Sequence, residues 1–185
     1  GITAQDKGSI VYNNNQVISY IFQEPRLLPW KTAKENIEFV IKGHTNHNLQ
    51  KKLNQYLDMV GLRQFKNYYP AFLSGGMKQR VSIARAFIYP SDTILMDEPL
   101  KTLDPTLKWN LMKTFLQVWQ KDKRTVIFVT HDVDEALMLG EEVFIFSQPP
   151  VKLKEKKTNY LSFQEKSPEN QKFFLLKNQI LKILD

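Results

Sequence analysis

The chain has 185 residues, of which 42% are hydrophobic and 24% charged, and it contains no cysteine. This size and mix fit one globular domain with a hydrophobic core, while the lack of cysteine excludes a disulfide scaffold, a cysteine-based zinc site and thiol catalysis. Its 26 basic and 19 acidic residues give a net charge of +7, which admits nucleic acid or an anionic membrane surface as a partner. No apolar run approaches the roughly 18–20 residues of a membrane span. Because position 1 is Gly rather than Met, we expect the natural start to lie upstream.

The first half of the chain predicts one strand, at residues 17–22, followed by three helices, at about residues 32–41, 48–59 and 74–87. Thr32 and Glu35 have the spacing of a capping box, which predicts the start of the first helix. Gly43 and Gly61 are expected to end the first and second helices. Ser74 is expected to cap the third helix.

The second half alternates strands with helices, which is typical of an α/β domain with a largely parallel sheet. Strands are predicted at residues 93–96, 125–130 and 142–147, and a long helix at residues 105–121. The run TVIFVT is β-branched and apolar throughout, so we expect that strand to be buried on both faces. Asp132 and Glu135 repeat the capping spacing and open a further short helix.

The chain is divided by prediction into a core, residues 1–150, with a helical subdomain at about 32–89, and an appendage, residues 151–185. Gln148-Pro149-Pro150 marks the boundary, and a lysine-rich segment expected to be a solvated edge comes after it. A terminal amphipathic helix then begins at Ser167-Pro168. Its apolar side is predicted to consist of Phe173, Phe174, Ile180, Leu181 and Leu184. Eight lysines come after Pro150, so much of the positive charge belongs to the appendage, and no aromatic interleaving supports nucleic-acid binding.

Two adjacent carboxylates, Asp97 and Glu98, end the apolar strand at residues 93–96. Ligands of open parallel sheets bind beyond the carboxyl ends of the strands. A strand places the two side chains on opposite sides, and Pro99 disfavours a helical backbone at Glu98 and so favours an extended one. One carboxylate can then hold hydrated Mg²⁺ while the other polarises an attacking water. The alternative is a buried strand that ends in a solvated acidic turn.

The octet LSGGMKQR at residues 73–80 places two glycines directly after the cap residue Ser74. Each glycine in a helix costs about 1 kcal/mol against alanine, so Gly75 and Gly76 suggest that backbone amides closely approach an anion such as phosphate. The alternative is an ordinary serine cap with a flexible entry. His131 and Gln23 also come directly after apolar strands, and although a lone histidine is more often structural, this position favours a functional one.

Five segments resemble, in chain order, the Q-loop, signature motif, Walker B motif, D-loop and H-loop of an ATP-binding cassette (ABC) ATPase. They are Gln23, residues 73–80, residues 93–99, Leu103-Asp104 and residues 129–132. The resemblance covers about residues 1–147, and the stretches FQEPRLLPW and VTHDVDEAL are most similar to importers of the nitrate/sulfonate/taurine type. It implies an α/β fold: a P-loop NTPase-like nucleotide-binding domain with a mainly parallel sheet and a helical signature subdomain, truncated at its N-terminus.

The resemblance also implies roles for the matched residues, with ATP and Mg²⁺ as cofactors. Asp97 would organise Mg²⁺, Glu98 would be the general base toward water, and His131 would contact the γ-phosphate. Gln23 would reach Mg²⁺ or the water and sense the nucleotide. Other matched residues would bind ATP that is held mainly by a second ATPase subunit, or would communicate across the interface with that subunit. These residues are Ser74, Gly75, Gly76, Gln79 and Asp104.

The family's phosphate loop, G-x-x-x-x-G-K-S/T, does not occur in these 185 residues. Gly1-Ile2-Thr3 resembles the segment that lies just beyond the phosphate-loop helix in this family. Backbone amides and the lysine of the loop hold the β- and γ-phosphates. We therefore expect that the chain as given neither binds ATP tightly nor hydrolyses it. We also expect uncovered apolar faces on neighbouring strands and helices.

An apolar, turn-rich stretch at residues 25–30, PRLLPW, lies shortly after Gln23. With the resemblance, it is interpreted as a groove for a short helix of a membrane permease; the alternative is a local core plug. The further partners implied are a second ATPase subunit in a homodimer and, indirectly, a periplasmic or extracellular solute-binding protein, with the protein peripheral on the cytoplasmic face of the membrane. The alternative function is a degenerate or non-transport ABC protein that acts as a regulatory or nucleic-acid-associated module.

Overall fold

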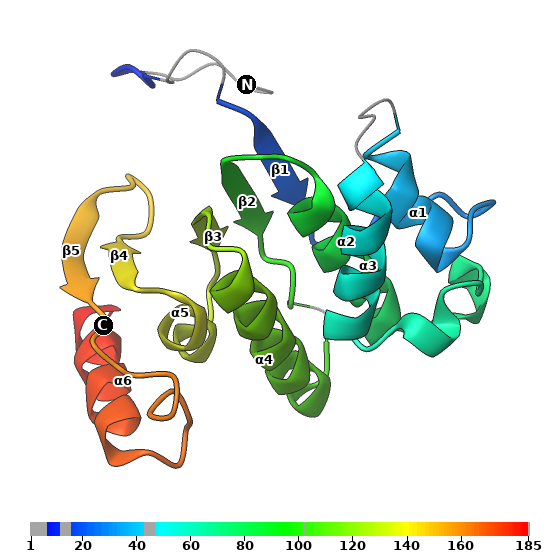
Figure 1. Cartoon of the computed structure of the whole chain (residues 1–185). Coiled ribbons are helices and arrows are strands. Elements are labelled where there is room, and N and C mark those ends of the chain that lie inside the picture. Colours follow the sequence, from blue (N-terminus) through cyan, green and yellow to red (C-terminus); the bar gives the residue numbers. More distant parts are fainter. Residues whose placement is uncertain (1–6, 12–15, 43–46, 102, 185) are drawn as a thin grey trace.

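The computed structural model describes residues 7–11, 16–42, 47–101 and 103–184. Gly43 and Gly1-Ile2-Thr3, which the sequence singles out, lie outside these residues. In chain order the elements are β1 (Ile18–Ile21), α1 (Ala33–Phe39), α2 (His47–Met59), the short 3-10 helices η1 (Arg63–Phe65) and η2 (Pro70–Phe72), α3 (Gly75–Ile88), β2 (Thr93–Asp97), α4 (Pro105–Lys121), β3 (Thr125–Val129), α5 (Val133–Leu139), β4 (Glu142–Phe146), β5 (Leu153–Thr158) and α6 (Gln171–Leu184) (Figure 1).

The central sheet has the order β1-β2-β3, and both of its pairings are parallel. Alternate residues of the strands, such as Ile21, Ile94 and Met96, point into one hydrophobic core that they share with residues of α1, α2, α3 and α4. This arrangement confirms the α/β class and the parallel sheet that the alternation of elements predicts.

The opposite face of the sheet is open in the part of the chain that the structure describes. On β3, Ile127 is 55% exposed and Val129 53%, and on β1 both Ile18 and Tyr20 are also exposed. The prediction that β3 is buried on both faces is therefore wrong, because only Val126 and Phe128 of this strand pack against the core. The expected uncovered apolar surface is present on this face.

The helices of the first half begin as their capping residues predict. Thr32 and Glu35 form the full capping box at the start of α1: the Thr32 hydroxyl accepts from the Glu35 amide, and the Glu35 carboxylate accepts from the Thr32 amide at 2.7 Å. The α1 helix ends at Phe39, slightly before the predicted end. After α2 the chain reverses at Gly61, whose φ of +67° is the left-handed conformation that glycine allows. Local chemistry thus fixes these boundaries.

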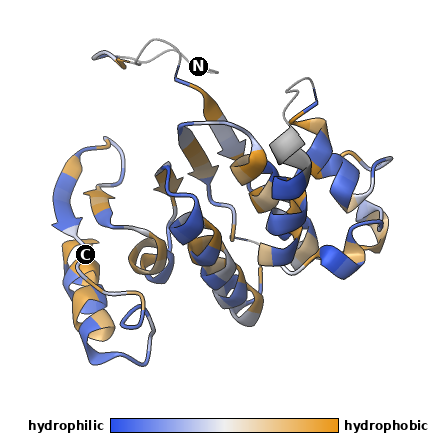
Figure 2. Ribbon diagram, viewed as in Figure 1, coloured by the Kyte–Doolittle hydropathy of each residue, from blue (hydrophilic) through white to orange (hydrophobic). Residues whose placement is uncertain are grey.

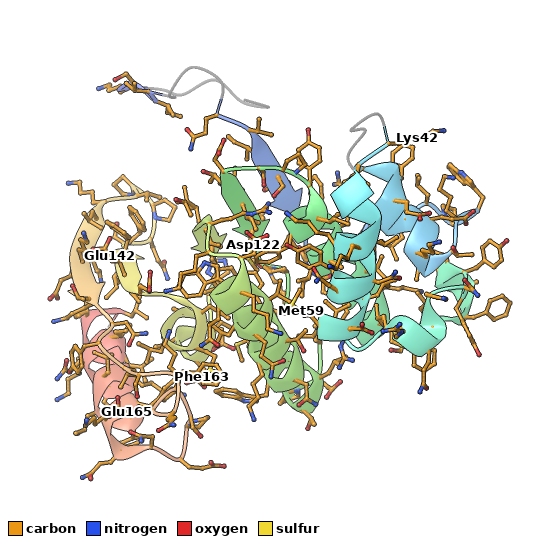
Figure 3. All side chains as sticks on the ribbon, viewed as in Figure 1. Lys42, Met59, Asp122, Glu142, Phe163 and Glu165 are labelled. Carbon is orange, nitrogen blue, oxygen red and sulfur yellow. The ribbon has the colours of Figure 1, made fainter. Side chains whose placement is uncertain are left out.

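Arg124, just before β3, bonds to the C-terminal ends of α3 and α4 and is linked to α2 through Asp122. Its guanidinium donates to the carbonyls of Phe87 and Tyr89 at 2.7 and 2.6 Å, and it pairs with Asp122 at 2.7 Å. The hydroxyl of Tyr56, on α2, donates to the same Asp122 carboxylate, which is labelled in Figure 3. Burial and this hydrogen bond raise the pKa of Tyr56 well above its usual range. The cluster therefore ties the helical part of the chain to the sheet.

The C-terminal part has its own small core. The β4 and β5 strands pair antiparallel, and α6 packs beside them and α5 (Figure 1). The lysine-rich segment expected to be a solvated edge forms β5, which is largely hydrophilic (Figure 2). The β4 and β5 strands pair across residue 150. The division of the chain into a core and an appendage at that residue stays a prediction.

The apolar side predicted for α6 is partly wrong. Phe173 and Ile180 are buried as predicted, together with Leu176, whereas Phe174, Leu181 and Leu184 are exposed. The side chains that α6 buries are those that face Leu137 and Ile145, across a second hydrophobic cluster. Among the described residues, no helix is both long and apolar enough to cross a membrane.

Replacing Arg124 with Met should lower the free energy of unfolding by about 2–4 kcal/mol, because two partly buried carbonyls and a partly buried carboxylate lose the hydrogen bonds that Arg124 donates. Urea denaturation followed by circular dichroism measures this loss. Arg63→Met is the matched control, since Arg63 pairs with Asp58 on the surface and such pairs contribute at most about 1 kcal/mol. Equal small losses for both variants would show that Arg124 does not hold the helices to the sheet.

Candidate functional site

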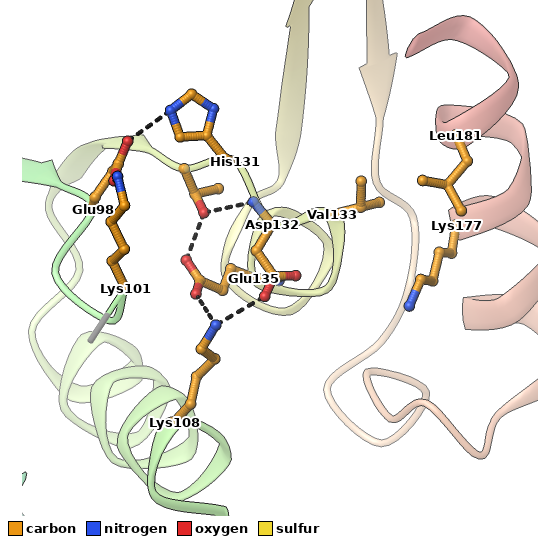
Figure 4. Close-up of a pocket in the computed structure, with 10 residues that line it drawn as sticks. Glu98, Lys101, Lys108, His131, Asp132, Val133, Glu135, Lys177 and Leu181 are labelled. Carbon is orange, nitrogen blue, oxygen red and sulfur yellow. Dashed lines mark hydrogen bonds and ion pairs between the residues drawn. The ribbon is translucent and has the colours of Figure 1, made fainter. Parts of the chain in front are cut away.

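The candidate site lies where β2 and β3 end. In the parallel register Asp97 is opposite Val129, so the residues that come after the two strands reach the same edge of the sheet. Glu98 directly succeeds β2, and His131 comes two residues after β3. The Nε2 atom of His131 lies 2.7 Å from Oε1 of Glu98 (Figure 4). The structure therefore brings together two residues that the sequence proposes for catalysis.

Glu98 adopts a left-handed backbone conformation, with φ of +40°. The extended backbone expected before Pro99 is therefore wrong. The chain turns at the strand end instead: the Glu98 amide donates to the Val129 carbonyl at 3.0 Å, and the Lys101 amide donates to the Glu98 carbonyl at 3.2 Å. A left-handed residue with a side chain costs about 1–3 kcal/mol and persists where its surroundings determine it. Here both backbone bonds hold it.

The carboxylate of Glu98 is engaged at both oxygens. While Oε1 faces His131, Oε2 lies 2.5 Å from Nζ of Lys101. The hydrogen bond and charge of Lys101, with a smaller contribution from His131, lower the pKa of Glu98. The carboxylate is therefore ionised at neutral pH, and it is a weaker base than a free glutamate. The His131 side chain is 83% exposed and so open to an incoming group.

A partly buried ion-pair network holds the residues on either side of His131. Glu135 is 2% exposed, and Lys108, on α4, lies 2.8 Å from it and 2.9 Å from Asp132. The Thr130 hydroxyl donates to Glu135 at 2.6 Å and accepts from the Asp132 amide at 3.0 Å. Although burial opposes it, the hydrogen bonds that Lys108 donates to Glu135 and Asp132 raise its pKa. The segment that carries His131 is thus fixed from both sides.

The start of α5 differs from a full capping box. Asp132 caps the helix as predicted, accepting from the amides of Asp134 and Glu135 at 2.9 and 3.4 Å. The Glu135 carboxylate, however, turns inward to Lys108 instead of returning to the cap residue. Residues that line the network also line a cavity of about 400 Å³, which Lys177 and Leu181 of α6 complete (Figure 4). Lys177 pairs with Asp134 at 2.8 Å.

Asp97 and Gln23 lie at the same sheet edge, exposed to solvent. Because Ile21 is opposite Met96 in the register, Gln23 leaves β1 near the point where Asp97 ends β2. The described residues contain no group of three or more His, Cys, Asp or Glu side chains that could hold a metal ion. One carboxylate nevertheless suits Mg²⁺, which commonly takes one or two carboxylates and fills its other positions with phosphate oxygens and water.

The remaining candidate residues gather at the N-termini of α3 and α4. Ser74 caps α3, its hydroxyl accepting from the Met77 amide at 3.3 Å. Asp104 caps α4, its carboxylate accepting from the Leu107 amide at 3.0 Å. A Cβ atom on Gly76 would lie 2.4 Å from Cδ1 of Leu107, so this glycine allows the two helix starts to approach closely.

Gly75 and Gln79 differ in their environment. A Cβ atom on Gly75 would meet nothing within 4 Å, and this residue is exposed beside Ser74. Gln79 is buried, and its amide nitrogen donates to the Phe22 carbonyl at 3.4 Å. The structure therefore places Gln79 between α3 and the end of β1, while Ser74 and Gly75 are open to a ligand.

The ABC transporter family model matches residues 2–101 of the chain. The chain is 33% identical to the aliphatic sulfonates import ATP-binding protein SsuB of Bacillus cereus, in an alignment that covers 98% of this chain and 74% of the relative. The chain belongs to the ABC transporter family. It is also 37% identical to the nitrate import ATP-binding protein NrtD of Synechocystis sp., over 83% of this chain and 58% of that protein. The predicted family resemblance is confirmed.

Solved structures support the same fold. The ABC protein superposes on cbiO1 from Clostridium perfringens, part of the ABC transporter complex cbiONQ, with a TM-score of 0.70 and 22% identity, covering 90% of this chain and 62% of that one. It also superposes on the ATP-binding cassette MJ0796, whose structure is a dimeric post-hydrolysis state bound to ADP and Pi. The TM-score is 0.61 and the identity 31%, and the match covers 80% of this chain and 65% of that one. The predicted fold class is confirmed.

Sequence reasoning did not find the pairing of Lys101 with Glu98, the pairing of Lys108 with Asp132 and Glu135, or the burial of Glu135. Each of these features depends on a partner on another element or turn, and no local pattern identifies such a partner. Glu135 did carry a signal, because its spacing from Asp132 marks a helix start. The packing of α4 beside α5, which turns Glu135 toward Lys108, is a tertiary feature.

Replacing Lys101 with Met should raise the pKa of Glu98, because the carboxylate loses its hydrogen bond and the nearby positive charge. Carbon-13 NMR titration of the Glu98 carboxyl measures the shift. Since the pKa of Glu98 is lower in the folded chain than in the unfolded one, its contribution to stability is present above the unfolded pKa and fades as the pH falls through the folded value. That acid-range contribution should shrink in the variant. Lys113→Met, on the exposed side of α4, should leave the titration unchanged, and an unchanged Lys101 variant would contradict the pairing.

Proposed function

We propose that this chain belongs to the ATP-hydrolysing subunit of an ABC importer for a small solute of the nitrate, sulfonate or taurine type. The observation that carries the proposal is the contact of Glu98 with His131 at the ends of two adjacent parallel strands. The names of the sulfonate and nitrate import relatives support the importer class.

In this proposal Glu98 is the general base that receives a proton from the attacking water, and His131 contacts the γ-phosphate. The imidazole holds the carboxylate in place through Nε2. Asp97 and Gln23 would hold Mg²⁺, which when bound neutralises charge on the phosphate oxygens. At the other cluster, Ser74 and the free amides at the start of α3 would bind the nucleotide of a second copy of the subunit, and the bound ADP and Pi of the dimeric MJ0796 structure support that arrangement.

These 185 residues contain no G-x-x-x-x-G-K-S/T sequence. We propose that they alone neither bind ATP tightly nor hydrolyse it, because the amide cradle and lysine for the β- and γ-phosphates are not among them. The amides at the start of α3 do not replace that cradle, since in this proposal they serve the nucleotide of the other subunit.

The segment at residues 25–30 is proposed as the permease contact. Trp30 is 69% exposed, which supports a docking surface over a core plug, while Leu27 and Leu28 of the same segment are partly buried. The cbiO1 structure, described as part of the cbiONQ transporter complex, supports assembly with other transporter subunits. A peripheral position on the cytoplasmic face of the membrane, a homodimer and indirect coupling to a solute-binding protein belong to the same proposal.

The positive charge does not favour the nucleic-acid alternative. Several appendage lysines are already paired: Lys156 with Glu142, Lys157 with Glu155 and Lys177 with Asp134, all within 2.8 Å. Lys154 donates to the carbonyls of Ile183 and Leu184 at the end of α6. These side chains serve the fold of the appendage.

Glu98→Gln in the complete transporter should lower the rate of ATP hydrolysis by about 100-fold or more, because a general base contributes at least that factor. Phosphate release measures the rate, and solute uptake into vesicles should fall with it. Calorimetric titration of Mg-ATP into the 185-residue chain should show neither tight binding nor turnover.

The matched control is Glu141→Gln, which changes an exposed carboxylate just before β4, outside the ends of β2 and β3, and should keep full activity. Hydrolysis at the parent rate in the Glu98 variant would refute the catalytic assignment. Micromolar Mg-ATP binding with steady turnover by the 185-residue chain would refute the proposal that it is inactive alone.

Trp30→Ala should weaken retention of the permease on the ATPase subunit by about tenfold, as expected for a tryptophan at the centre of an interface, with little change in the KM for ATP. Co-purification of the transporter over a range of salt and detergent measures retention. Tyr160→Ala is the matched control, because Tyr160 has the same 69% exposure as Trp30 but lies in the appendage. The reverse pattern, normal retention with weaker ATP affinity, would contradict the docking role.

A further inference from the structure

The segment just after Gln23 is bonded to α3 through its backbone. Arg85, near the C-terminal end of α3, donates from Nη2 to the Pro25 carbonyl at 2.8 Å and from Nη1 to the Arg26 carbonyl at 3.0 Å. A guanidinium presents its donors in a rigid planar fork, which can hold two neighbouring acceptors at once. One side chain of α3 therefore fixes two consecutive peptide groups of the segment.

The conformation that Arg85 holds is a strained one. Arg26 has φ of +45°, which is uncommon for a residue with a side chain and persists where the surroundings determine it. The Arg26 guanidinium also lies 4.1 Å from the centre of the Phe22 ring, an attractive cation–π arrangement. The backbone is thus bent at Arg26 and held there by contacts on both sides.

The second half of the segment is bonded to α1 through Asn36, which is 1% exposed. Its Oδ1 accepts from the Leu28 amide at 2.7 Å, and its Nδ2 lies 3.1 Å from the Leu28 carbonyl and 3.0 Å from the carbonyls of Lys31 and Thr32. A single buried amide therefore serves four backbone groups. Trp30, which is exposed to solvent, lies between Leu28 and Lys31, whose backbone groups Asn36 holds.

We propose that Arg85 and Asn36 are positioning residues, which hold residues 25–32 in one conformation, the docking arch, before any partner binds. The inference rests on the proposed function in one respect, since it takes the arch as the permease contact. Arg85 belongs to the helix that begins at Ser74, so the arch and the proposed nucleotide-binding end of α3 are parts of one bonded unit. Preorganisation lowers the entropy lost on docking.

Amide hydrogen exchange in the 185-residue chain tests the positioning role without any partner. Arg85→Met should speed exchange of the Leu28 and Lys31 amides by about tenfold or more, because local opening of the arch becomes easier, and leave the Ile94 amide of β2 unchanged. Arg85→Lys, which keeps the charge and one donor, should give an intermediate rate. Arg63→Met, an exposed arginine on the same helical part of the chain, should change none of these rates.

The second measurement uses the complete transporter. Arg85→Met should reduce permease retention in the same direction as Trp30→Ala while the KM for ATP stays near the parent value. If Arg85→Met does not fold, the intermediate variant Arg85→Lys carries both measurements.

The two parts fail separately. Unchanged exchange at Leu28 and Lys31, or faster exchange at Ile94 by the same factor, would overturn the positioning role. Faster local exchange with normal retention in the Arg85 variant, alongside reduced retention in Trp30→Ala, would overturn the link from preorganisation to docking. Normal retention in Trp30→Ala would overturn the permease contact itself, and the exchange result would still decide whether Arg85 holds the arch.

Discussion

The parallel pairing of β2 with β3 is the constraint on which the candidate site depends. Its register sets Asp97 opposite Val129, so that the chain turning after one strand meets the chain leaving the other. The Glu98 amide bonds to the Val129 carbonyl, which makes the turn itself an extension of the sheet. The left-handed backbone at Glu98, the contact with His131 and the pairing with Lys101 all result from that junction.

Helix α3 plays the corresponding part for the rest of the molecule. It packs against α1, α2 and α4 and against β1, and its side chains reach backbone groups well outside the helix. Gln79 and Arg85 bond to the chain on either side of Gln23, while Arg124 bonds to carbonyls at its C-terminal end. Proposed nucleotide contacts, the arch and the sheet therefore meet on one rigid element.

The parts of the structure that the sequence predicted well are those determined by neighbouring residues. Helix starts at Thr32, Ser74 and Asp132 arise from side chains that bond to amides two or three positions later. The positions of the strands along the chain, and the placement of Glu98 and His131 after strand ends, arise from the apolar runs. Such features need no knowledge of the elements that lie across the fold.

The features that the sequence did not predict depend on distant partners. The backbone conformation of Glu98 is set by its hydrogen bond to a carbonyl on β3. The exposure of Ile127 depends on which face of the sheet the helices cover. Phe174 and Leu176 lie on the same short helix, yet only the packing of α6 decides that Leu176 is the buried one. Hydrophobicity alone does not separate them. The roles of the candidate site residues remain predictions, since geometry places these residues without testing their chemistry.

The caps of α3 and α4 give the N-termini of these two neighbouring helices different net charges. Both ends carry the partial positive charge of the helix dipole, and Gly76 lets them approach closely. At α4 the carboxylate of Asp104 cancels part of that charge, whereas at α3 the neutral hydroxyl of Ser74 bonds to an amide and leaves the charge in place, with no acidic residue in the first turn. An anion is consequently attracted more strongly to the start of α3 than to the adjacent start of α4, because one helix is capped by a hydroxyl and the other by a carboxylate.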